Sequence, residues 1–333
     1  MNPPKCKETD YIDFIIATPR QITATEAARV QPEQAKAPAH DAFTRLLQRT
    51  EPDPEQVWQE AGTQVRLNEG IPVIDDPTPD KPYAGHIGLV GRHRSGKHHA
   101  VVSGINLITL LRTDGDRAVP TDYRISDKAK DRLSRNDHFP EMIRIAKDRG
   151  FYPGMVCFDS RYASAENLKP VTAQGWQFLT GLKSDRLVNA DKQGLRHVSE
   201  IGIPESGRVV RLKGFGLVRV FRIVAEDGTG EHRATGSVEM SDPERLKYAG
   251  YAWQIGHYHR GIRQYCLIER AQVRSGRAWR NHIGLCLRAF LRIGSHCYYK
   301  GISRVQAKTD IIRDAVRSYI SNPLYSLVLN PTA

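Results

Sequence analysis

Two short apolar runs that each end in aspartate constrain the fold of this chain more than any other feature. Ile71–Asp75 and residues 155–159 have the length and composition of buried strands, and an acid closes each of them. Two more strand-like segments, 100–111 and 122–125, and a segment with helical spacing, 128–149, lie between them. This order predicts an α/β sheet with acids at the ends of its strands.

These acids are candidate metal ligands. Hard cations such as Mg²⁺ and Mn²⁺ bind oxygen ligands, and acids that neighbouring strands bring together can share such ions. The candidates are Asp75, Asp76 and Asp159. Taken one at a time, each also fits a turn residue or a helix cap, which is the commoner role of an aspartate after a strand.

The rest of the chain divides into helical and β-rich regions around this predicted core. We expect a helical N-terminal region (1–65), the first part of the core (66–185), a β-rich insertion (186–243), a basic helical remainder of the core (244–300) and a C-terminal helical tail (301–333). Within these regions we expect helical structure over 39–60 with loops at the Pro-containing stretches before and between. We also expect a strand over 177–182 and helices over 163–173, 242–274, 278–298 and 305–321.

The charge of the chain points to a polyanionic partner. Lysine and arginine number 49 against 37 acids, which gives a net charge of +12. The excess is concentrated in 244–300, where eleven basic residues face two acids. Such a block can follow a phosphate backbone, so we expect nucleic acid as the partner. The candidates for contacting phosphates are Arg260, Arg263, Arg270 and Arg274; the alternative is a solvated basic face.

Neither a secreted nor a membrane protein is expected. The five cysteines are scattered without a Cys-x-x-Cys pair, which argues against a disulfide framework or a zinc site. The N-terminal residues have no signal-peptide pattern, and no run of 18 apolar residues occurs. We therefore expect a cytoplasmic, nucleoid-associated protein.

Residues 91–98 nearly match a nucleotide-binding loop. The pattern Gly-x4-Gly-Lys is present, but His98 stands where a serine or threonine would hold Mg²⁺. The segment that follows indicates a strand, whereas that motif requires a helix. We interpret 91–98 as a basic β-hairpin turn rather than as an ATPase or GTPase site.

Several blocks, in order and at suitable spacing, together resemble bacterial insertion-sequence transposases of the DDE class. They are 75–83, 104–106, 159–167, 183–186, 234–235, 253–264 and 281–283. The resemblance implies an RNase H-like mixed sheet flanked by helices, with a β-rich insertion and helical additions at both ends. It also implies cleavage and strand transfer on double-stranded DNA (element ends and target), Mg²⁺ or Mn²⁺ as cofactor, and a homodimer on the DNA.

The same resemblance implies three metal-binding acids, one of which is missing. The first would be Asp75, with Asp76 the less favoured choice, and the second Asp159. The family motif Trp-x-(Ile/Val)-Glu-x-Tyr-His-(x)3-(Lys/Arg)-Gln matches 253–264 except that Gly256 replaces the glutamate. Arg263 keeps the basic charge of that motif, whereas Arg161 stands where an aromatic residue is common.

Helical geometry indicates that no nearby acid replaces the missing one. Residue 256 shares its helix face with Ala249, Ala252, Arg260 and Arg263. Two more distant acids would lie about 18–20 Å away along a continuous helix, Glu244 and Glu269.

The other side chains of the helix receive weaker assignments. The opposite face is expected to be core, with Ile255, Tyr258, Ile262 and Cys266, and Trp253 is expected to pack. His257 and His259 could assist at the site, although a surface or core role is commoner for a histidine.

The hypothesis is a transposase that keeps its fold and DNA binding but cleaves poorly or not at all because of Gly256. The alternatives are a non-catalytic DNA-binding protein derived from a transposase and a metal-dependent nuclease without strand transfer.

Overall fold

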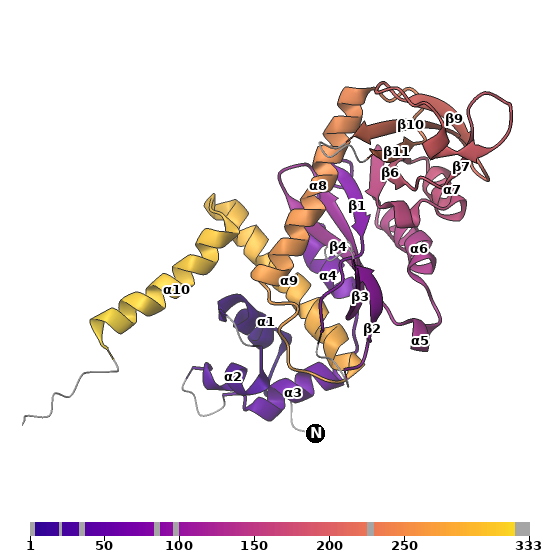
Figure 1. Ribbon diagram of the computed structural model, residues 1–333. Helices are drawn as coiled ribbons and strands as arrows, with labels where there is room; N and C mark the ends of the chain where they lie inside the picture. The colour runs from indigo at the N-terminus through magenta and orange to yellow at the C-terminus, as the bar shows by residue number, and fades with distance from the viewer. Residues whose placement is uncertain are drawn as a thin grey trace, which may run out of the picture.

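A single mixed sheet runs through the protein, and helices cover both of its faces (Figure 1). The computed structural model describes residues 4–19, 22–32, 37–82, 87–95, 100–224 and 230–323. The tip of the hairpin predicted within 91–98 lies outside these residues, but the strands on either side of it pair antiparallel, as expected.

Among the described residues the sheet has eleven strands in the order β2-β3-β1-β5-β6-β11-β10-β9-β7-β8, with β4 paired to β3. Their bounds are β1 (Ile71–Asp75), β2 (Val90–Ser95), β3 (Ala100–Thr113), β4 (Ala118–Ser126), β5 (Met155–Phe158), β6 (Gln177–Leu182), β7 (Leu187–Asn189), β8 (Arg196–His197), β9 (Arg208–Leu212), β10 (Gly216–Val224) and β11 (Gly230–Thr235). The strands expected as an insertion extend this sheet, because β11 pairs antiparallel with β6.

The helices are α1 (Glu8–Ala17), α2 (Ala24–Arg29), α3 (His40–Arg49), α4 (Glu55–Ala61), α5 (Lys128–Asp131), α6 (Arg135–Asp148), α7 (Ala165–Ala173), α8 (Asp242–Gln264), α9 (Gly276–Lys300) and α10 (Arg304–Ser321). One face of the sheet packs against α8, α9 and the N-terminal helices, and the other packs against α6 and α7. Side chains alternate between these two cores along each strand: Val73 belongs to the first and Ile74 to the second.

The two acid-bearing strands are neighbours and run parallel. In β1 and β5, Val73 lies opposite Cys157 and Ile74 lies opposite Phe158. Because both strands run in the same direction, Asp75 and the residue after β5, Asp159, reach the same edge of the sheet. The prediction of acids gathered at strand ends is confirmed.

Two helices that the sequence predicted as continuous are shorter, whereas 39–60 forms α3 and α4 with a proline-containing loop between them, as expected. The segment 128–149 forms α5 and α6, with Arg132 between them at φ 56°. The helix expected over 242–274 ends at Gln264, and Leu267 beyond it has φ 52°, which no α-helix accommodates.

The N-terminal helices are held against α9 by polar contacts. The Asn281 side chain donates to the carbonyl oxygens of Leu47 (2.7 Å) and Thr50 (2.8 Å) at the end of α3. Arg288 donates to Glu60 (2.7 Å) and also forms an ion pair with Glu8. The C-terminal carbonyls of α3 therefore find their hydrogen-bond donors on α9.

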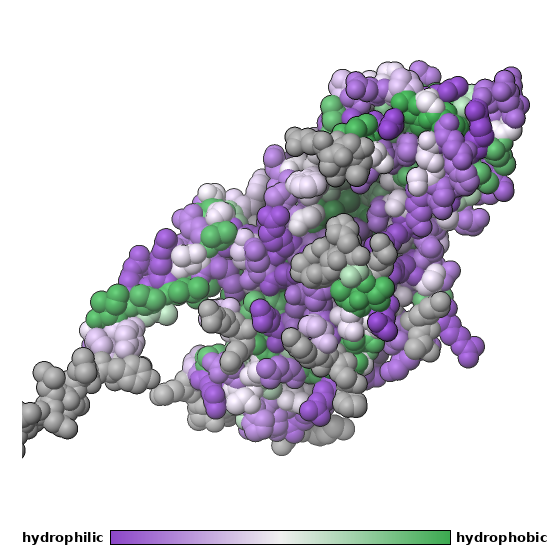
Figure 2. Space-filling model, in the orientation of Figure 1, coloured by the Kyte–Doolittle hydropathy of each residue, from purple (hydrophilic) through white to green (hydrophobic). Residues whose placement is uncertain are grey.

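The last described helix, α10, extends away from the body (Figure 1). None of its side chains is buried, and Ile312, Val316 and Ile320 are among its exposed apolar side chains. An apolar band runs along the helix in the space-filling view (Figure 2). Lys308 ties the start of the helix to the end of α1 by donating to the carbonyl oxygen of Ile15 at 3.2 Å.

All five cysteines are buried and free. Within the described part of the chain, no helix combines the length and apolarity needed to cross a bilayer.

Replacing Asn281 by leucine should lower the free energy of unfolding by about 1–3 kcal/mol, because the buried carbonyl of Leu47 and the partly buried carbonyl of Thr50 would lose their donor. Urea unfolding followed by circular dichroism measures the loss. The matched control is Arg317→Ala on exposed α10, which should change stability by less than about 0.5 kcal/mol. Equal stability of Asn281→Leu and the parent chain would contradict this account of how α3 docks.

Candidate functional site

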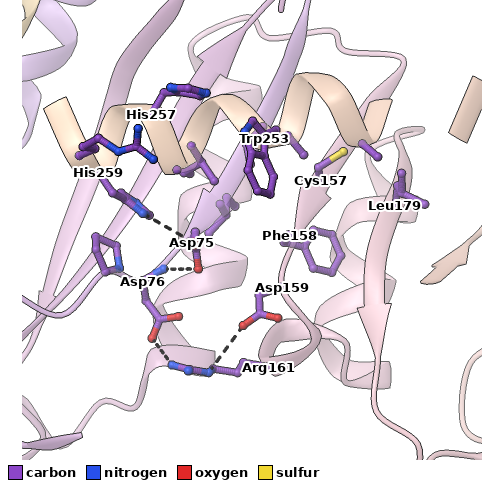
Figure 3. Close-up of a pocket in the computed structure, with 18 of the residues that line it drawn as sticks. Asp75, Asp76, Cys157, Phe158, Asp159, Arg161, Leu179, Trp253, His257 and His259 are labelled. Atoms are coloured by element: carbon purple, nitrogen blue, oxygen red, sulfur yellow. Dashed lines mark hydrogen bonds and ion pairs between the residues drawn. The ribbon is translucent and has the colours of Figure 1, made fainter. Parts of the chain in front are cut away.

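Three carboxylates gather at the edge of the sheet where β1 and β5 end (Figure 3). Asp75, Asp76 and Asp159 each offer an oxygen atom, and these oxygens lie within 4.8 Å of one another. The side chains of Asp75 and Asp159 are 34% and 41% exposed, whereas that of Asp76 is 1% exposed. The structure thus brings together all three acids that the sequence singled out, and solvent reaches two of them.

Asp76 is held by two arginines. Arg135, at the start of α6, forms an ion pair with its Oδ2, and the Nη1 atom of Arg161 donates to the same oxygen at 3.0 Å. Arg161 belongs to the 3-10 turn Ser160–Tyr162, and its Nε also lies 3.6 Å from Asp159 Oδ2. Asp76 Oδ1 is buried and has no hydrogen-bond partner among the described residues.

Sequence reasoning noted Arg161 only as a departure from the family and missed Arg135 altogether. No local signal marks Arg135, which lies 59 residues from Asp76. Both arginines are explained by the structure, because a carboxylate as buried as Asp76 needs cations beside it.

Crowding disfavours the charge on these acids. Burial, followed by the neighbouring charge of Asp76, raises the pKa of Asp75 to about 7. Burial also raises the pKa of Asp76, against the opposing effect of Arg135 and Arg161. A further cation at the cluster would favour the ionised forms.

Helix α8 covers the acids and encloses a cavity of about 640 Å³ with them. The α8 residues that line this cavity are Ala249, Ala252, Trp253, Ile255, Gly256, His257, His259, Arg260 and Arg263. The predicted helix face, with Gly256 at its centre, therefore borders the carboxylates. A Cβ atom on Gly256 would meet no atom within 4 Å, so the space for a side chain at this position is open.

His259 is the α8 side chain that turns toward Asp75. Its Nδ1 lies 3.8 Å from Asp75 Oδ2, which is too long for a hydrogen bond. Burial, together with the charge of Arg263, lowers the pKa of His259 to about 3, so the ring is neutral at physiological pH. Its Nε2 is buried and has no hydrogen-bond partner in the described part of the chain.

The sequence predicts that Trp253 packs against the protein, and this prediction is wrong. It is 72% exposed and lines the cavity, one helical turn before Gly256. By contrast, Tyr258 and Ile262 are buried, as predicted for the opposite face of the helix, and Cys266 is buried just beyond the end of α8. Ile255 was predicted for the same core face, but it is only half-buried and lines the cavity.

The four candidate arginines separate into two pairs. Arg260 and Arg263 line the cavity, whereas Arg270 and Arg274 lie beyond the end of α8 and take no part in it. The helix predicted over 242–274 would have held all four arginines, but α8 ends at Gln264.

Glu269 is not separated from Gly256 by a continuous helix, as the sequence had suggested, because α8 ends at Gln264. Its Oε1 accepts a hydrogen bond from the Asp80 backbone amide at 3.3 Å, outside the cavity. Glu244 caps the start of α8 with Ser241. Neither acid substitutes for the absent side chain at position 256.

Comparison with known proteins gives a similarity of fold. The cryo-EM structure of a piggyBac transposase synaptic complex with hairpin DNA matches with a TM-score of 0.56 at 9% sequence identity, covering 100% of this chain and 78% of that one. A Drosophila P element transposase strand transfer complex matches more distantly, with a TM-score of 0.30 at 8% identity over 58% of this chain and 48% of that one. No protein-family model and no curated protein matches the sequence. The chain thus has a mixed α/β fold similar to that of the piggyBac transposase.

Proposed function

We propose that this protein is a DDE-type transposase that binds DNA and whose metal-dependent cleavage and strand transfer are impaired by Gly256. The observation that carries the proposal is the pair Asp75 and Asp159 at the ends of two adjacent parallel strands, beneath a helix that presents Arg260 and Arg263. The similarity of fold to a transposase that was solved with hairpin DNA supports it.

Several finer assignments belong to the same proposal. The core, with the strand order β4-β3-β1-β5-β6, would be RNase H-like. If the protein is a DDE-class transposase, we also propose an origin in a bacterial insertion sequence, a homodimer on DNA and a nucleoid location. The domain bounds expected from the sequence belong to the same proposal.

The carboxylate cluster fits a divalent cation. All three donors are carboxylates, which suit hard cations such as Mg²⁺ or Mn²⁺, and Asp76 Oδ1 is buried without a partner in the described structure. Asp75 and Asp159 would hold the ion, since Asp76 Oδ2 is engaged by the two arginines. Such an ion supplies an activated nucleophile and stabilises the attacking and leaving oxygens of the phosphodiester.

The side chains around the cluster have distinct roles in this proposal. Arg135 and Arg161 hold Asp76 and thereby orient the turn after β1. Arg260 and Arg263 donate to DNA phosphates, and the exposed ring of Trp253 offers a surface for a base. With glycine at 256, the helix contributes no carboxylate, which leaves the donor set one acid short.

Replacing Gly256 by glutamate should restore nicking of supercoiled plasmid in the presence of Mg²⁺ or Mn²⁺. The side chain has open space, and replacing a glycine inside a helix should stabilise the fold by about 0.5–1 kcal/mol. Agarose-gel analysis of nicked product measures the gain. Gly256→Gln is the matched control, because it fills the same space without a charge and should stay inactive.

A second substitution tests the site itself. Asp159→Asn in the Gly256→Glu chain should abolish nicking. Robust cleavage by the unmodified protein that survives Asp159→Asn would refute both the site assignment and the impairment by Gly256.

Metal binding should depend on pH through Asp75. Without metal, the folded chain keeps a proton on Asp75 that the unfolded chain releases, so this group makes stability fall as pH rises from about 4 to about 7. Mn²⁺ needs the ionised carboxylate, so it should raise the midpoint of thermal unfolding more at pH 8 than at pH 6. Differential scanning fluorimetry measures both effects, and both should disappear in Asp75→Asn; an equal Mn²⁺ effect in that variant would exclude Asp75 as a ligand.

DNA binding should rely on the arginines of α8. The double change Arg260→Gln with Arg263→Gln should weaken binding of a fluorescent duplex and lower the slope of log affinity against log salt by about 2. Fluorescence anisotropy at several salt concentrations measures this. The control is Arg270→Gln with Arg274→Gln, which removes the same charge and should lose less affinity for the duplex. An equal loss of affinity would mean that overall positive charge, rather than the α8 arginines, directs binding.

The second candidate function is a non-catalytic DNA-binding protein derived from a transposase, which Gly256 favours. Salt-dependent DNA binding without metal-dependent cleavage, even after glutamate is restored at 256, identifies it. A metal-dependent nuclease would instead cut DNA without joining the cut ends to a target.

A further inference from the structure

A second hollow lies along α8 beside the carboxylate cavity. It has a volume of about 730 Å³ and is bordered by α8, α9, the start of α10 and the turn before β4. His257 and Arg260 line both this groove and the carboxylate cavity, so α8 forms a shared wall between them. A chain-like ligand that lies across α8 at these two residues reaches both hollows.

Three arginines line the groove without a carboxylate partner in the described structure: Arg117, Arg260 and Arg304. Asp116 is the one acid among the described residues that line it. Many arginines elsewhere in the protein do have such partners, for example Arg288 with Glu60. The groove is therefore a site of uncompensated positive charge.

Aromatic rings hold two of these arginines in place. The guanidinium of Arg117 lies 4.2 Å from the centre of the Tyr298 ring, and that of Arg304 lies 4.3 Å from the centre of the Phe290 ring. Arg304 packs closely over Gly294, where a Cβ would approach its Nη2 to 2.8 Å. The Nε of Arg304 is buried and has no hydrogen-bond partner among the described residues.

We propose that this groove binds the phosphate backbone of the DNA as it continues past the carboxylate cavity. The ligand is an anion because the lining offers fixed guanidinium donors, which bind phosphate oxygens well. It is a chain because the lining of the two hollows spans Ala249 to Gln264 on α8, about 22 Å of helix. At about 3.4 Å per phosphate along one strand of a duplex, that length matches roughly six phosphates.

This inference rests on the proposed function, since it names the path of the DNA toward the same carboxylates. It adds Arg117, Arg304 and Tyr298 to the contacts, none of which belongs to the predicted α8 face. Tyr298 is 60% exposed, and its ring can approach a sugar or a base while it supports Arg117.

The test measures binding of a fluorescent duplex of about 24 base pairs by anisotropy over a range of salt concentrations. The double variant Arg117→Gln with Arg304→Gln should bind several-fold more weakly than the parent chain, and its salt slope should fall by about 2. The matched control is Arg313→Gln with Arg317→Gln on exposed α10, which removes the same charge from arginines that pair with acids. It should bind nearly as well as the parent.

Cross-linking gives a reading that does not depend on the folding of the double variant. A duplex carrying 5-iodouracil, irradiated in complex with the unmodified protein, should yield a cross-link to Tyr298 that mass spectrometry locates.

Each outcome separates this inference from the proposed function. If the parent chain binds DNA and loses affinity on changing Arg260 and Arg263, while the groove variant behaves like its control and Tyr298 is not cross-linked, the groove inference fails and the proposed function stands. If the parent chain does not bind the duplex at all, the proposed function fails, and the groove inference fails with it.

Discussion

The parallel pairing of β1 with β5 is the interaction on which the rest of the site depends. It places Asp75 and Asp159 at one edge of the sheet, and the alternation of side chains directs Val73 and Cys157 into the core beneath α8. Antiparallel pairing would have sent the two acids to opposite edges. Helix α8 covers this edge of the sheet, and the side chains that face the acids complete the cavity.

The second constraint is the repulsion among the three clustered carboxylates, and two arginines beside Asp76 offset part of their negative charge. Asp76 is almost wholly buried, and Arg135 and Arg161 lie against it. Buried ion pairs contribute little net stability, but removing one partner is costly. These arginines are thus best understood as holding the turn after β1 in shape, which leaves Asp75 and Asp159 accessible to solvent and to a cation.

Helix α8 links the two hollows of the protein. Its buried face, with Tyr258 and Ile262, anchors it to the core, while its exposed face borders both the carboxylate cavity and the arginine-lined groove. Gly256 lies on this exposed face with open space above it. The fold therefore does not require glycine here.

The sequence by itself determined the elements whose signals are local. The apolar runs ending at Asp75 and Asp159, the face of the helix around Gly256 and the core positions Tyr258 and Ile262 follow from periodicities of two and 3.6 residues, which the structure confirms. Contacts between distant segments decided the rest. The engagement of Asp76 by Arg135, the exposure of Trp253, the end of α8 at Gln264 and the groove at Arg117 and Arg304 all depend on which surfaces meet after folding. Such contacts join residues dozens to hundreds of positions apart, and no local pattern of side chains encodes them.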